Sequence, residues 1–504
     1  MSLLGALLVG HHTRFGSGTN GDSIRYIMGA ENLLAGNGYS RTSGGGEIKP
    51  ITGFPPVFSI ILAGLGYLTG DVFNTARFLL CLLFAANIFL MTLLLFRYTG
   101  SIWPSLISAI LAISAQEVLW LHTWILTEAL FIFLMLLAFY MLTAYLDSNK
   151  ILFLLLASVV IGSASLTRYI GLALTAAGGL SILLLSQNSW KRRLLDGLVL
   201  GVGTFLPLIL WFYRNAAISD NVSNRVISYS PIPAKVLRIY IADVLAWFAP
   251  RIMDLPRPIR NILVAILALP LPAAFFFKEL KAGLQKGKKE GQTFWTLPWI
   301  LTSFIIFYVV ILVLNSTFLD PALTPQGQSR YLVPLFVTTV VLFSLMAHRL
   351  LKGIKFISPY RILIIAVSVL LIILYALESW IYLRDPLMNI GYTGLKTLWP
   401  DTVEGIQSLD PETIIVANNP EMAYALAGRP AYMMPILQDA STGNIREDFD
   451  QQIEATREKL EKGGVLFIFG AMSTHDREVI ECLEAEPVGV FFDSAMFGYP
   501  EAVE

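Results

Sequence analysis

The sequence has little charge and almost no cysteine. Charged residues make up 14% of the 504 positions, and Lys plus Arg equal Asp plus Glu at 36 each, so the net charge says nothing about nucleic acid and the informative quantity is where each sign lies along the chain. The two cysteines, Cys81 in an apolar run and Cys482 in the polar tail, have no CxxC or Cys/His spacing around them. This pattern supports neither a disulfide framework nor a zinc site, and we expect no nucleic-acid partner.

Apolar residues dominate what is present. Hydrophobic residues make up 55% of the chain and the mean hydropathy is +0.64, well above that of an average soluble domain. After residue 70, apolar runs lie near 73–96, 101–121, 125–146, 151–166, 169–187, 195–213, 259–277, 294–315, 331–347 and 360–383. A helix needs roughly 20 residues to cross a bilayer core, so the sequence predicts a polytopic α-helical membrane protein.

Charge placement between the runs indicates how the chain crosses the bilayer. Basic residues gather in alternate connections, at Arg97, 191–193, 278–289 and 348–361. By the positive-inside rule these connections are cytoplasmic. The extracytoplasmic side then holds residues 11–52, the turns with Glu128 and Arg168, the loops 214–260 and 315–330, and the carboxy-terminal region. Nearly every isolated charge at a helix end therefore faces one compartment.

Two segments near the start need separate treatment. Residues 1–10 are apolar but too short to cross, so they predict a partial first span. Residues 54–69 are apolar enough to cross, but a full crossing would move Asp22 to the side opposite Glu128. We therefore expect an interfacial or re-entrant helix there, entered through Pro55-Pro56. The prediction is about eleven transmembrane helices, with a cytoplasmic amino terminus and an outer carboxy terminus.

The composition changes near residue 385, where charged residues return and short strand and helix patterns alternate. We therefore expect two domains. Residues 1–384 form the transmembrane domain, whose first outer loop spans 11–72, and residues 385–504 form a small extracytoplasmic α/β domain.

The first outer loop contains an amphipathic segment, GDSIRYIMGAENLLAG, that predicts an interfacial helix over residues 23–35. Asp22 lies at its start. One interpretation is that Asp22 only caps the helix, a position that Asp favours. The other is that Asp22 is a general base, and the two are compatible because a carboxylate held by backbone N–H groups stays ionised.

Further charged residues at outer helix ends are candidates for the same site. Glu128 is either an exposed carboxylate in a first helical turn or the partner of Asp22 in an acid/base pair. Arg168, Arg214 and Arg330 each lie beside an aromatic residue and fit interfacial anchors. Basic residues are normally depleted outside, however, and several arginines with Lys49 would suit an anionic phosphate or diphosphate. His11 and His12 lack further spaced ligands, so we assign no metal to them.

The order of these motifs resembles a known family. An acid precedes IRY and a helix ending in L-x-x-G-x-G-Y; then come a PP-containing helix ending in Gly, T-E at an outer helix start, LTRY-x-G, W-x-x-RN and a late RY-L-x-P. Over roughly residues 1–380 this is similar to the GT-C integral-membrane glycosyltransferases, and most to the protein O-mannosyltransferase and lipid A aminoarabinose transferase families.

The resemblance implies transfer of a sugar from a polyprenyl-phosphate carrier to an acceptor at the outer face. Asp22 matches the catalytic acid of the first loop and Glu128 the second acidic position. Arg168, Arg330 and Lys49 would bind the donor phosphate, although Pro55-Pro56 follow Lys49 at a changed spacing. The chain departs from the family pattern at Ser23, where a second acid is usual.

Adjacent motif residues Arg25, Tyr26, Tyr169 and Tyr331 are candidates for positioning the substrate. The first loop lacks a DxD metal motif, so we expect no cofactor. Acidic residues from other loops could still bind a divalent metal ion.

The sequence thus predicts an inverting glycosyltransferase of the cell envelope, embedded in the plasma membrane, with Asp22 as general base. Its expected partners are a polyprenyl-phosphate sugar donor, a lipid, glycan or protein acceptor, and the bilayer. One alternative is a ligase or polymerase of lipid-linked glycans. A transporter is less favoured, since its charges would be expected near the membrane midplane.

Overall fold

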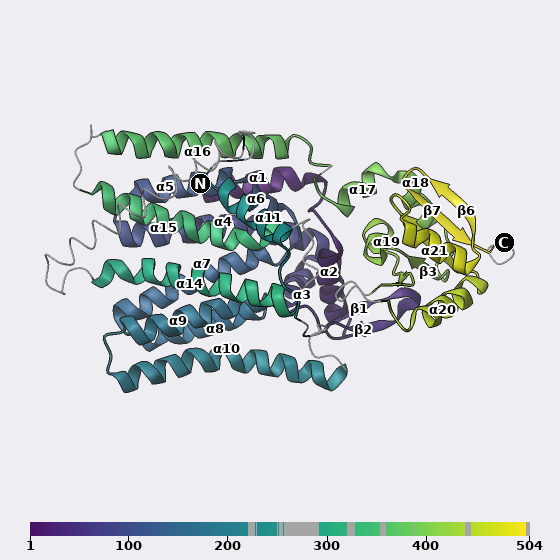
Figure 1. Ribbon diagram of the computed structural model, residues 1–504, viewed down its shortest axis with the longest axis horizontal. Coiled ribbons are helices and arrows are strands. Elements are labelled where there is room, and N and C mark those ends of the chain that lie inside the picture. The colour runs from purple at the N-terminus through teal and green to yellow at the C-terminus, as the bar shows by residue number, and fades with distance from the viewer. Residues whose placement is uncertain are drawn as a thin grey trace.

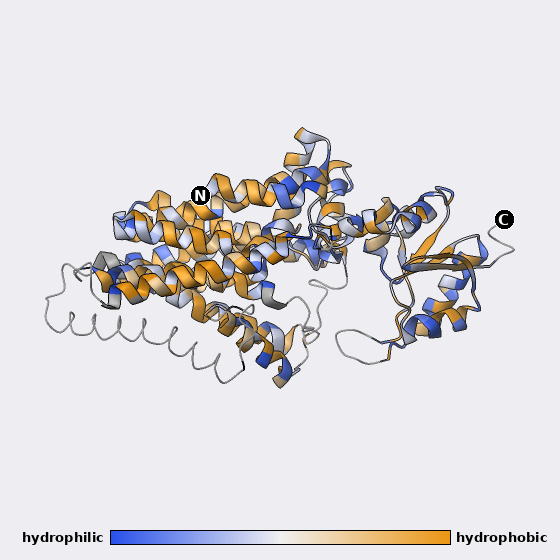
Figure 2. Ribbon diagram, turned by 90° about the horizontal axis from the view of Figure 1, so that it is seen from above, coloured by the Kyte–Doolittle hydropathy of each residue, from blue (hydrophilic) through white to orange (hydrophobic). Residues whose placement is uncertain are grey.

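A bundle of long helices and a smaller α/β domain meet at one end of the bundle (Figure 1). The computed structural model describes residues 1–219, 227, 229–248, 250, 256, 292–319, 328–352, 359–387, 389–438 and 445–499. Hydrophobic residues cover most of the bundle, whereas hydrophilic residues are more frequent in the carboxy-terminal domain (Figure 2). The predicted polytopic helical protein with a small α/β domain is confirmed.

The bundle contains helices long enough to span a membrane. Within the described residues, six helices qualify by length and composition, or seven if a bent pair counts as one span. They belong to α4 (Val72–Thr99), α7 (Glu128–Ser148), α10 (Trp190–Ile218), α14 (Gln292–Phe318), α15 (Val333–Leu351) and α16 (Pro359–Leu383). The bent pair is α5 (Ile102–Ser114) with α6 (Gln116–Thr123), at 63°.

Shorter helices complete the membrane domain: α1 (Ser2–His12), α8 (Ile151–Ser165), α9 (Leu172–Leu185), α11 (Ala234–Ala246), and the 3-10 turns η1 (Thr13–Phe15), η3 (Tyr169–Gly171) and η5 (Gln328–Leu332). The predicted span at 259–277 lies outside the described residues. The count of about eleven crossings therefore stays a prediction.

The first loop folds against the end of the bundle. It contains α2 (Gly21–Leu34), the hairpin strands β1 (Ser40–Thr42) and β2 (Ile48–Pro50) around η2 (Gly44–Gly46), and α3 (Val57–Thr69). Helix α3 packs on α2 and α4 and ends at the left-handed Gly70. Its 13 residues span about 20 Å, less than a bilayer core of about 30 Å, which agrees with a helix that does not cross.

The carboxy-terminal domain is built on one five-stranded sheet in the order β4-β3-β5-β7-β6. Strand β3 (Ile415–Ala417) pairs in parallel with β4 (Tyr432–Met433) and β5 (Val465–Phe469), while β7 (Ser494–Gly498) pairs antiparallel with β5 and β6 (Glu486–Phe491). The helices of this domain are α17 (Tyr392–Leu398), α18 (Pro400–Gln407), α19 (Pro420–Ala427), α20 (Phe449–Glu461) and α21 (Thr474–Leu483). The central strand β5 is fully buried, as its sequence VLFIF predicts for a strand covered on both faces.

Candidate active site

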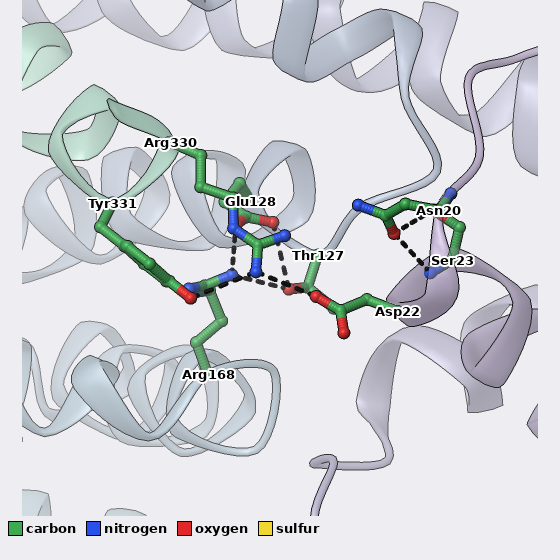
Figure 3. A network of polar contacts seen from close by, with 8 residues as sticks. All are labelled: Asn20, Asp22, Ser23, Thr127, Glu128, Arg168, Arg330 and Tyr331. Carbon is green, nitrogen blue, oxygen red and sulfur yellow. Dashed lines mark hydrogen bonds and ion pairs between the residues drawn. The ribbon is translucent and has the colours of Figure 1, made fainter. Parts of the chain in front are cut away.

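Four charged side chains from distant parts of the chain form one ion cluster where the bundle meets the first loop (Figure 3). Arg330 lies between the two acids, with Nη2 2.9 Å from Asp22 Oδ2 and Nε 3.6 Å from Glu128 Oε1. Arg168 Nη1 lies 2.6 Å from the same Glu128 oxygen. We call Asp22, Glu128, Arg168 and Arg330 the ion cluster below. The fold thus brings both predicted acids and two of the predicted phosphate-binding arginines together.

Uncharged side chains fix the two guanidinium groups in this cluster. Arg168 Nη1 donates to Thr127 Oγ1 at 3.1 Å, and Arg330 Nη2 donates to the Tyr331 hydroxyl at 3.1 Å. The Tyr331 ring also lies 5.2 Å from the Arg168 guanidinium and 5.1 Å from that of Arg330, within the range of a cation–π contact. Tyr308 donates its hydroxyl to the Tyr331 carbonyl at 2.7 Å and so holds this turn in place.

The two acids differ in their access to solvent. Glu128 is only 1% exposed, whereas the Asp22 side chain is 30% exposed. A buried carboxylate is costly unless it is paired, and Glu128 is paired with two guanidinium groups. Asp22 is paired with the Arg330 guanidinium, and part of its side chain is exposed. The geometry therefore suits Glu128 to a supporting role and Asp22 to contact with a substrate.

The protonation of Arg168 is secured by its surroundings. Burial is the largest single effect and acts to lower the pKa of its guanidinium, but the interactions with Glu128, Tyr331 and Tyr308 together outweigh burial, so the pKa is raised. Arg168 is therefore a permanent cation in the site. A fixed positive charge that is only 17% exposed is suited to bind an anion, because the interaction is poorly screened by water.

Asp22 is left free for chemistry because another residue caps its helix. Helix α2 has Asn20 as N-cap, and Asn20 exchanges hydrogen bonds with Ser23 in a capping box. The interpretation of Asp22 as the N-cap is therefore wrong: its carboxylate projects from the first turn toward Arg330 (Figure 3). Ser23, which replaces the usual second acid, has this structural use.

A short three-stranded backbone arrangement holds the chain just before α2. Gly18 pairs with the segment ahead of Glu128. The Gly18 N–H donates to the Thr123 carbonyl at 2.7 Å, and the Gly18 carbonyl accepts from the Ile125 N–H at 2.8 Å. On the other edge, the Thr19 N–H donates to the Ile390 carbonyl at 3.2 Å, and the Thr19 carbonyl accepts from the Tyr392 N–H at 3.1 Å. We call this arrangement the junction sheet. It links the backbone near Asp22 to the backbone near Glu128 and to the start of the carboxy-terminal domain.

The remaining predicted site residues make contacts outside the ion cluster. Lys49 pairs with Glu47 at 2.9 Å and lies over the ring of Tyr432 in the carboxy-terminal domain, not within the ion cluster. Arg214 donates to the carbonyls of Ile51 and Tyr39 at 2.8 and 2.9 Å, which fixes the first loop on α10.

Arg25 pairs with Glu421 of the carboxy-terminal domain. Tyr26 is buried against Phe54 and Phe58, and Tyr169 accepts from Trp211 Nε1 at 2.9 Å. Of the predicted positioning residues, Tyr331 thus contacts the ion cluster directly.

Thr127 and Tyr308 were missed as site residues. Thr127 carried a usable signal, since it directly precedes Glu128 and the pair was part of the recognised motif. Tyr308 lies within an apolar run of α14, where nothing distinguishes it from a packing residue. Within the described part of the chain, no group of three His, Cys, Asp or Glu side chains is placed to hold a metal ion.

Comparisons with known proteins agree with this architecture. The family profile described as dolichyl-phosphate-mannose-protein mannosyltransferase matches residues 30–218, which include Glu128 and Arg168. No curated protein sequence matches the chain significantly. The crystal structure of ArnT from Cupriavidus metallidurans bound to undecaprenyl phosphate has a TM-score of 0.61 at 12% identity, covering 99% of this chain and 98% of that chain.

Two further solved structures are similar. ArnT from the same organism in the apo state has a TM-score of 0.63 at 13% identity, covering 97% of this chain and 95% of that chain. The oligosaccharyltransferase AglB from Archaeoglobus fulgidus, in complex with an inhibitory peptide and a dolichol-phosphate, has a TM-score of 0.46 at 14% identity, covering 93% of this chain and 69% of that chain.

The profile match confirms the resemblance seen in the sequence, and the fold shared with ArnT over nearly the whole chain is consistent with it. Residues 30–218 are thus similar in sequence to the dolichyl-phosphate-mannose-protein mannosyltransferase family, and the chain has the fold of ArnT over nearly its whole length.

Proposed function

We propose that the protein transfers a sugar from a polyprenyl-phosphate carrier to an acceptor at the extracytoplasmic membrane face, with Asp22 as general base and inversion at the sugar. The observation that carries this proposal is the ion cluster, in which an accessible carboxylate adjoins two guanidinium groups at one end of the bundle. A base beside an anion-binding pair is what attack on a phosphate-activated sugar requires.

The donor class is supported by the relatives. The matching family is described by its use of dolichyl-phosphate-mannose, and one ArnT structure contains undecaprenyl phosphate. Arg168 and Arg330 would bind the phosphate, since guanidinium groups match phosphate oxygens in two-point hydrogen bonds. Lys49 remains a proposed secondary contact, which would need to leave Glu47 and the Tyr432 ring to reach the donor.

In the proposed reaction, a hydroxyl or amine of the acceptor attacks the anomeric carbon and gives its proton to the Asp22 carboxylate. The bond between the anomeric carbon and the phosphate oxygen breaks, and its electron pair leaves with the polyprenyl phosphate. Arg168 and Arg330 stabilise the negative charge that develops on this leaving group. Attack from the face opposite the phosphate inverts the configuration at the anomeric carbon.

The ion pair between Arg330 and Asp22 gives the donor a way to prepare the base. A carboxylate that is paired with a guanidinium is a weaker proton acceptor than a free one. A donor phosphate that draws Arg330 Nη2 toward itself would release the Asp22 carboxylate beside the sugar. Glu128 would keep Arg168 and Arg330 in position during this exchange, because it contacts both.

The membrane topology belongs to the same proposal. We place the ion cluster and the carboxy-terminal domain on the extracytoplasmic side of the plasma membrane, with about eleven crossings in all. The positive-inside pattern of the connections supports this placement. The acceptor is a lipid, a glycan or a protein, and the domain that covers the first loop would help to select it. Concentration of the ion cluster at a bundle end favours group transfer over transport.

A steady-state transfer assay tests the function. Purified full-length protein is incubated with dolichyl-phosphate mannose or undecaprenyl-phosphate sugars, radiolabelled in the sugar, and with membranes that supply acceptors. We expect Asp22→Asn to lower transfer by roughly 10²–10⁴-fold, the usual contribution of a general base. Asp71→Asn is the matched control, since Asp71 is an exposed cap of α4 outside the ion cluster. Transfer by Asp22→Asn at the control rate would show that Asp22 is not the base.

A further inference from the structure

A carboxylate of the carboxy-terminal domain contacts the helix that carries Asp22. Glu421 Oε1 lies 2.7 Å from Arg25 Nη2 and accepts a hydrogen bond from Arg25 Nε at 2.9 Å. The Glu421 side chain is 9% exposed, whereas surface ion pairs of this domain, such as Arg457 with Glu454, are far more accessible. A buried carboxylate requires a partner, and Arg25 is a partner of Glu421.

Arg25 has a second acid within reach on its own helix. Asp22 and Arg25 are three residues apart in α2, a spacing that places oppositely charged side chains next to each other on a helix surface. Glu421 instead draws the Arg25 guanidinium toward the carboxy-terminal domain. In this position the guanidinium also lies 5.4 Å from the ring of Phe54, a residue of the first loop. Within the described part of the chain, Asp22 is thereby left paired with Arg330.

The same helix is held by a second contact with the same element. Tyr424, one turn after Glu421 in α19, donates its hydroxyl to Glu31 of α2. Two consecutive turns of α19 therefore engage two positions along α2, which fixes both the place and the rotation of the helix. The junction sheet holds the chain just ahead of α2 at Thr19. The carboxy-terminal domain thus contacts the Asp22 helix along its length and contacts the chain just ahead of its start.

We infer that Glu421 is a positioning residue for the transfer reaction: by holding Arg25 away from Asp22, it keeps the Asp22 carboxylate available as the proton acceptor. This inference rests on the proposed role of Asp22. It gives the carboxy-terminal domain a part in positioning the base, in addition to any role in selecting the acceptor. Without the Glu421 charge, Arg25 would turn to Asp22, and the carboxylate would be occupied by two guanidinium groups.

Removal of the charge alone gives the first measurement. In Glu421→Gln, we expect kcat for transfer from the radiolabelled polyprenyl-phosphate sugar to fall roughly tenfold, the effect of one hydrogen bond to a charged group. The KM for the donor should stay within about twofold, because Arg168 and Arg330 are untouched. Glu454→Gln, which breaks the exposed ion pair with Arg457 in the same domain, is the matched control and should have the wild-type kcat. An unchanged kcat in Glu421→Gln would overturn the inference.

A rescue experiment separates positioning from simple docking of the domain. Arg25→Gln alone should keep at least about a third of the wild-type kcat, and the double variant Arg25→Gln/Glu421→Gln should recover to within about twofold of it. Recovery is expected because the competing cation is gone, although the ion pair between the domains is still missing. A double variant as slow as Glu421→Gln, or an inactive Arg25→Gln, would overturn the inference.

The two hypotheses fail in different ways. An active Asp22→Asn variant would refute the proposed base and with it the premise of this inference. If Asp22→Asn is inactive while Glu421→Gln has the wild-type kcat, the base stands and only the positioning role of Glu421 is refuted.

Discussion

Within the ion cluster, each charged side chain has a distinct environment that suits it to one task. Glu128 is buried and contacts two guanidinium groups, whereas Asp22 is partly exposed and contacts one. The ion cluster has no net charge, because its two carboxylates face two guanidinium groups (Figure 3). An incoming phosphate must then compete with Asp22 and Glu128 for the arginines, which couples donor binding to release of the base.

Substitution of the cluster arginines should weaken binding of the carrier phosphate. We expect Arg330→Gln to raise the Kd for undecaprenyl phosphate roughly 10- to 100-fold, because a hydrogen bond to a charged group contributes about 1.5–3 kcal/mol. The measurement is a titration that follows the thermal stability of the purified protein in detergent. Arg97→Gln is the matched control, since Arg97 pairs with Asp147 at the other end of α4. Equal Kd values for both variants would contradict the assignment of Arg330 to the phosphate.

The four charged residues of the ion cluster were all predicted from the sequence, because isolated charges stand out beside apolar runs. Their mutual contacts could not be predicted, since 308 positions separate Asp22 from Arg330 and tertiary packing alone brings them together. The cap of α2 was misjudged for a local reason. Asn20 and Asp22 are both favoured caps, and the reciprocal bond from Ser23 decides in favour of Asn20.

At the scale of elements, the junction sheet connects the parts that build the site. It places Gly18 between the segment that leads to Glu128 and the segment that enters the carboxy-terminal domain. Its close backbone approach depends on glycine at two positions. A Cβ at Gly391 would lie 2.2 Å from the carbonyl oxygen of Thr19, and a Cβ at Gly18 would lie 2.6 Å from the Trp124 ring.

A methyl group at Gly391 should therefore disturb the site from a distance. Gly391 has φ of +55°, where a side chain is strained, and the clash is with backbone that cannot rotate away. We expect Gly391→Ala to lower transfer at least about tenfold and to make the linker before α17 more sensitive to limited proteolysis. Gly64→Ala is the control, because a Cβ there meets open space. Wild-type transfer and proteolysis in Gly391→Ala would show that the junction sheet is not needed.

Most elements of the described chain follow from the sequence pattern. The amphipathic helix predicted at 23–35 is α2, and short strands and helices alternate in the carboxy-terminal region, as its sequence pattern predicted. Two features were not predicted. The run at 101–121 bends between α5 and α6 although no proline or glycine marks the bend at residue 115. The glycine-rich stretch at residues 44–46 forms the turn of the β1–β2 hairpin, and this turn packs on Tyr432.

For the whole molecule, the important arrangement is that the first loop and the carboxy-terminal domain share one end of the bundle (Figure 1). The ion cluster lies at the same end, because Asp22 of the first loop belongs to it. The basic residues in alternate connections of the sequence predicted that these parts lie on the same side of the membrane domain. Which compartment this end faces remains a prediction from the positive-inside rule. Residues 278–289, which contributed to that prediction, lie outside the described residues.

The two natural cysteines allow a direct test of sidedness. Cys482 is exposed in the carboxy-terminal domain, and Cys81 lies partly buried in α4. We expect a membrane-impermeant maleimide to label Cys482 in intact cells whose outer surface is accessible, and Cys482→Ala to abolish that labelling. Lys352→Cys in the Cys482→Ala background, at the opposite end of α15, should react only after lysis. The reverse pattern would place the ion cluster in the cytoplasm.

The role of Asp22 is tested most directly by a single-turnover measurement. Wild-type, Asp22→Asn and Asp71→Asn proteins are loaded with the radiolabelled polyprenyl-phosphate sugar that the wild type turns over, and are then mixed with acceptor membranes. We expect Asp22→Asn to bind the donor at least as tightly as the wild type, because the carboxylate charge that competes for Arg330 is gone, and to transfer the sugar roughly 10²–10⁴-fold more slowly. Transfer by Asp22→Asn within about threefold of the Asp71→Asn rate would contradict the assignment of Asp22 as the general base.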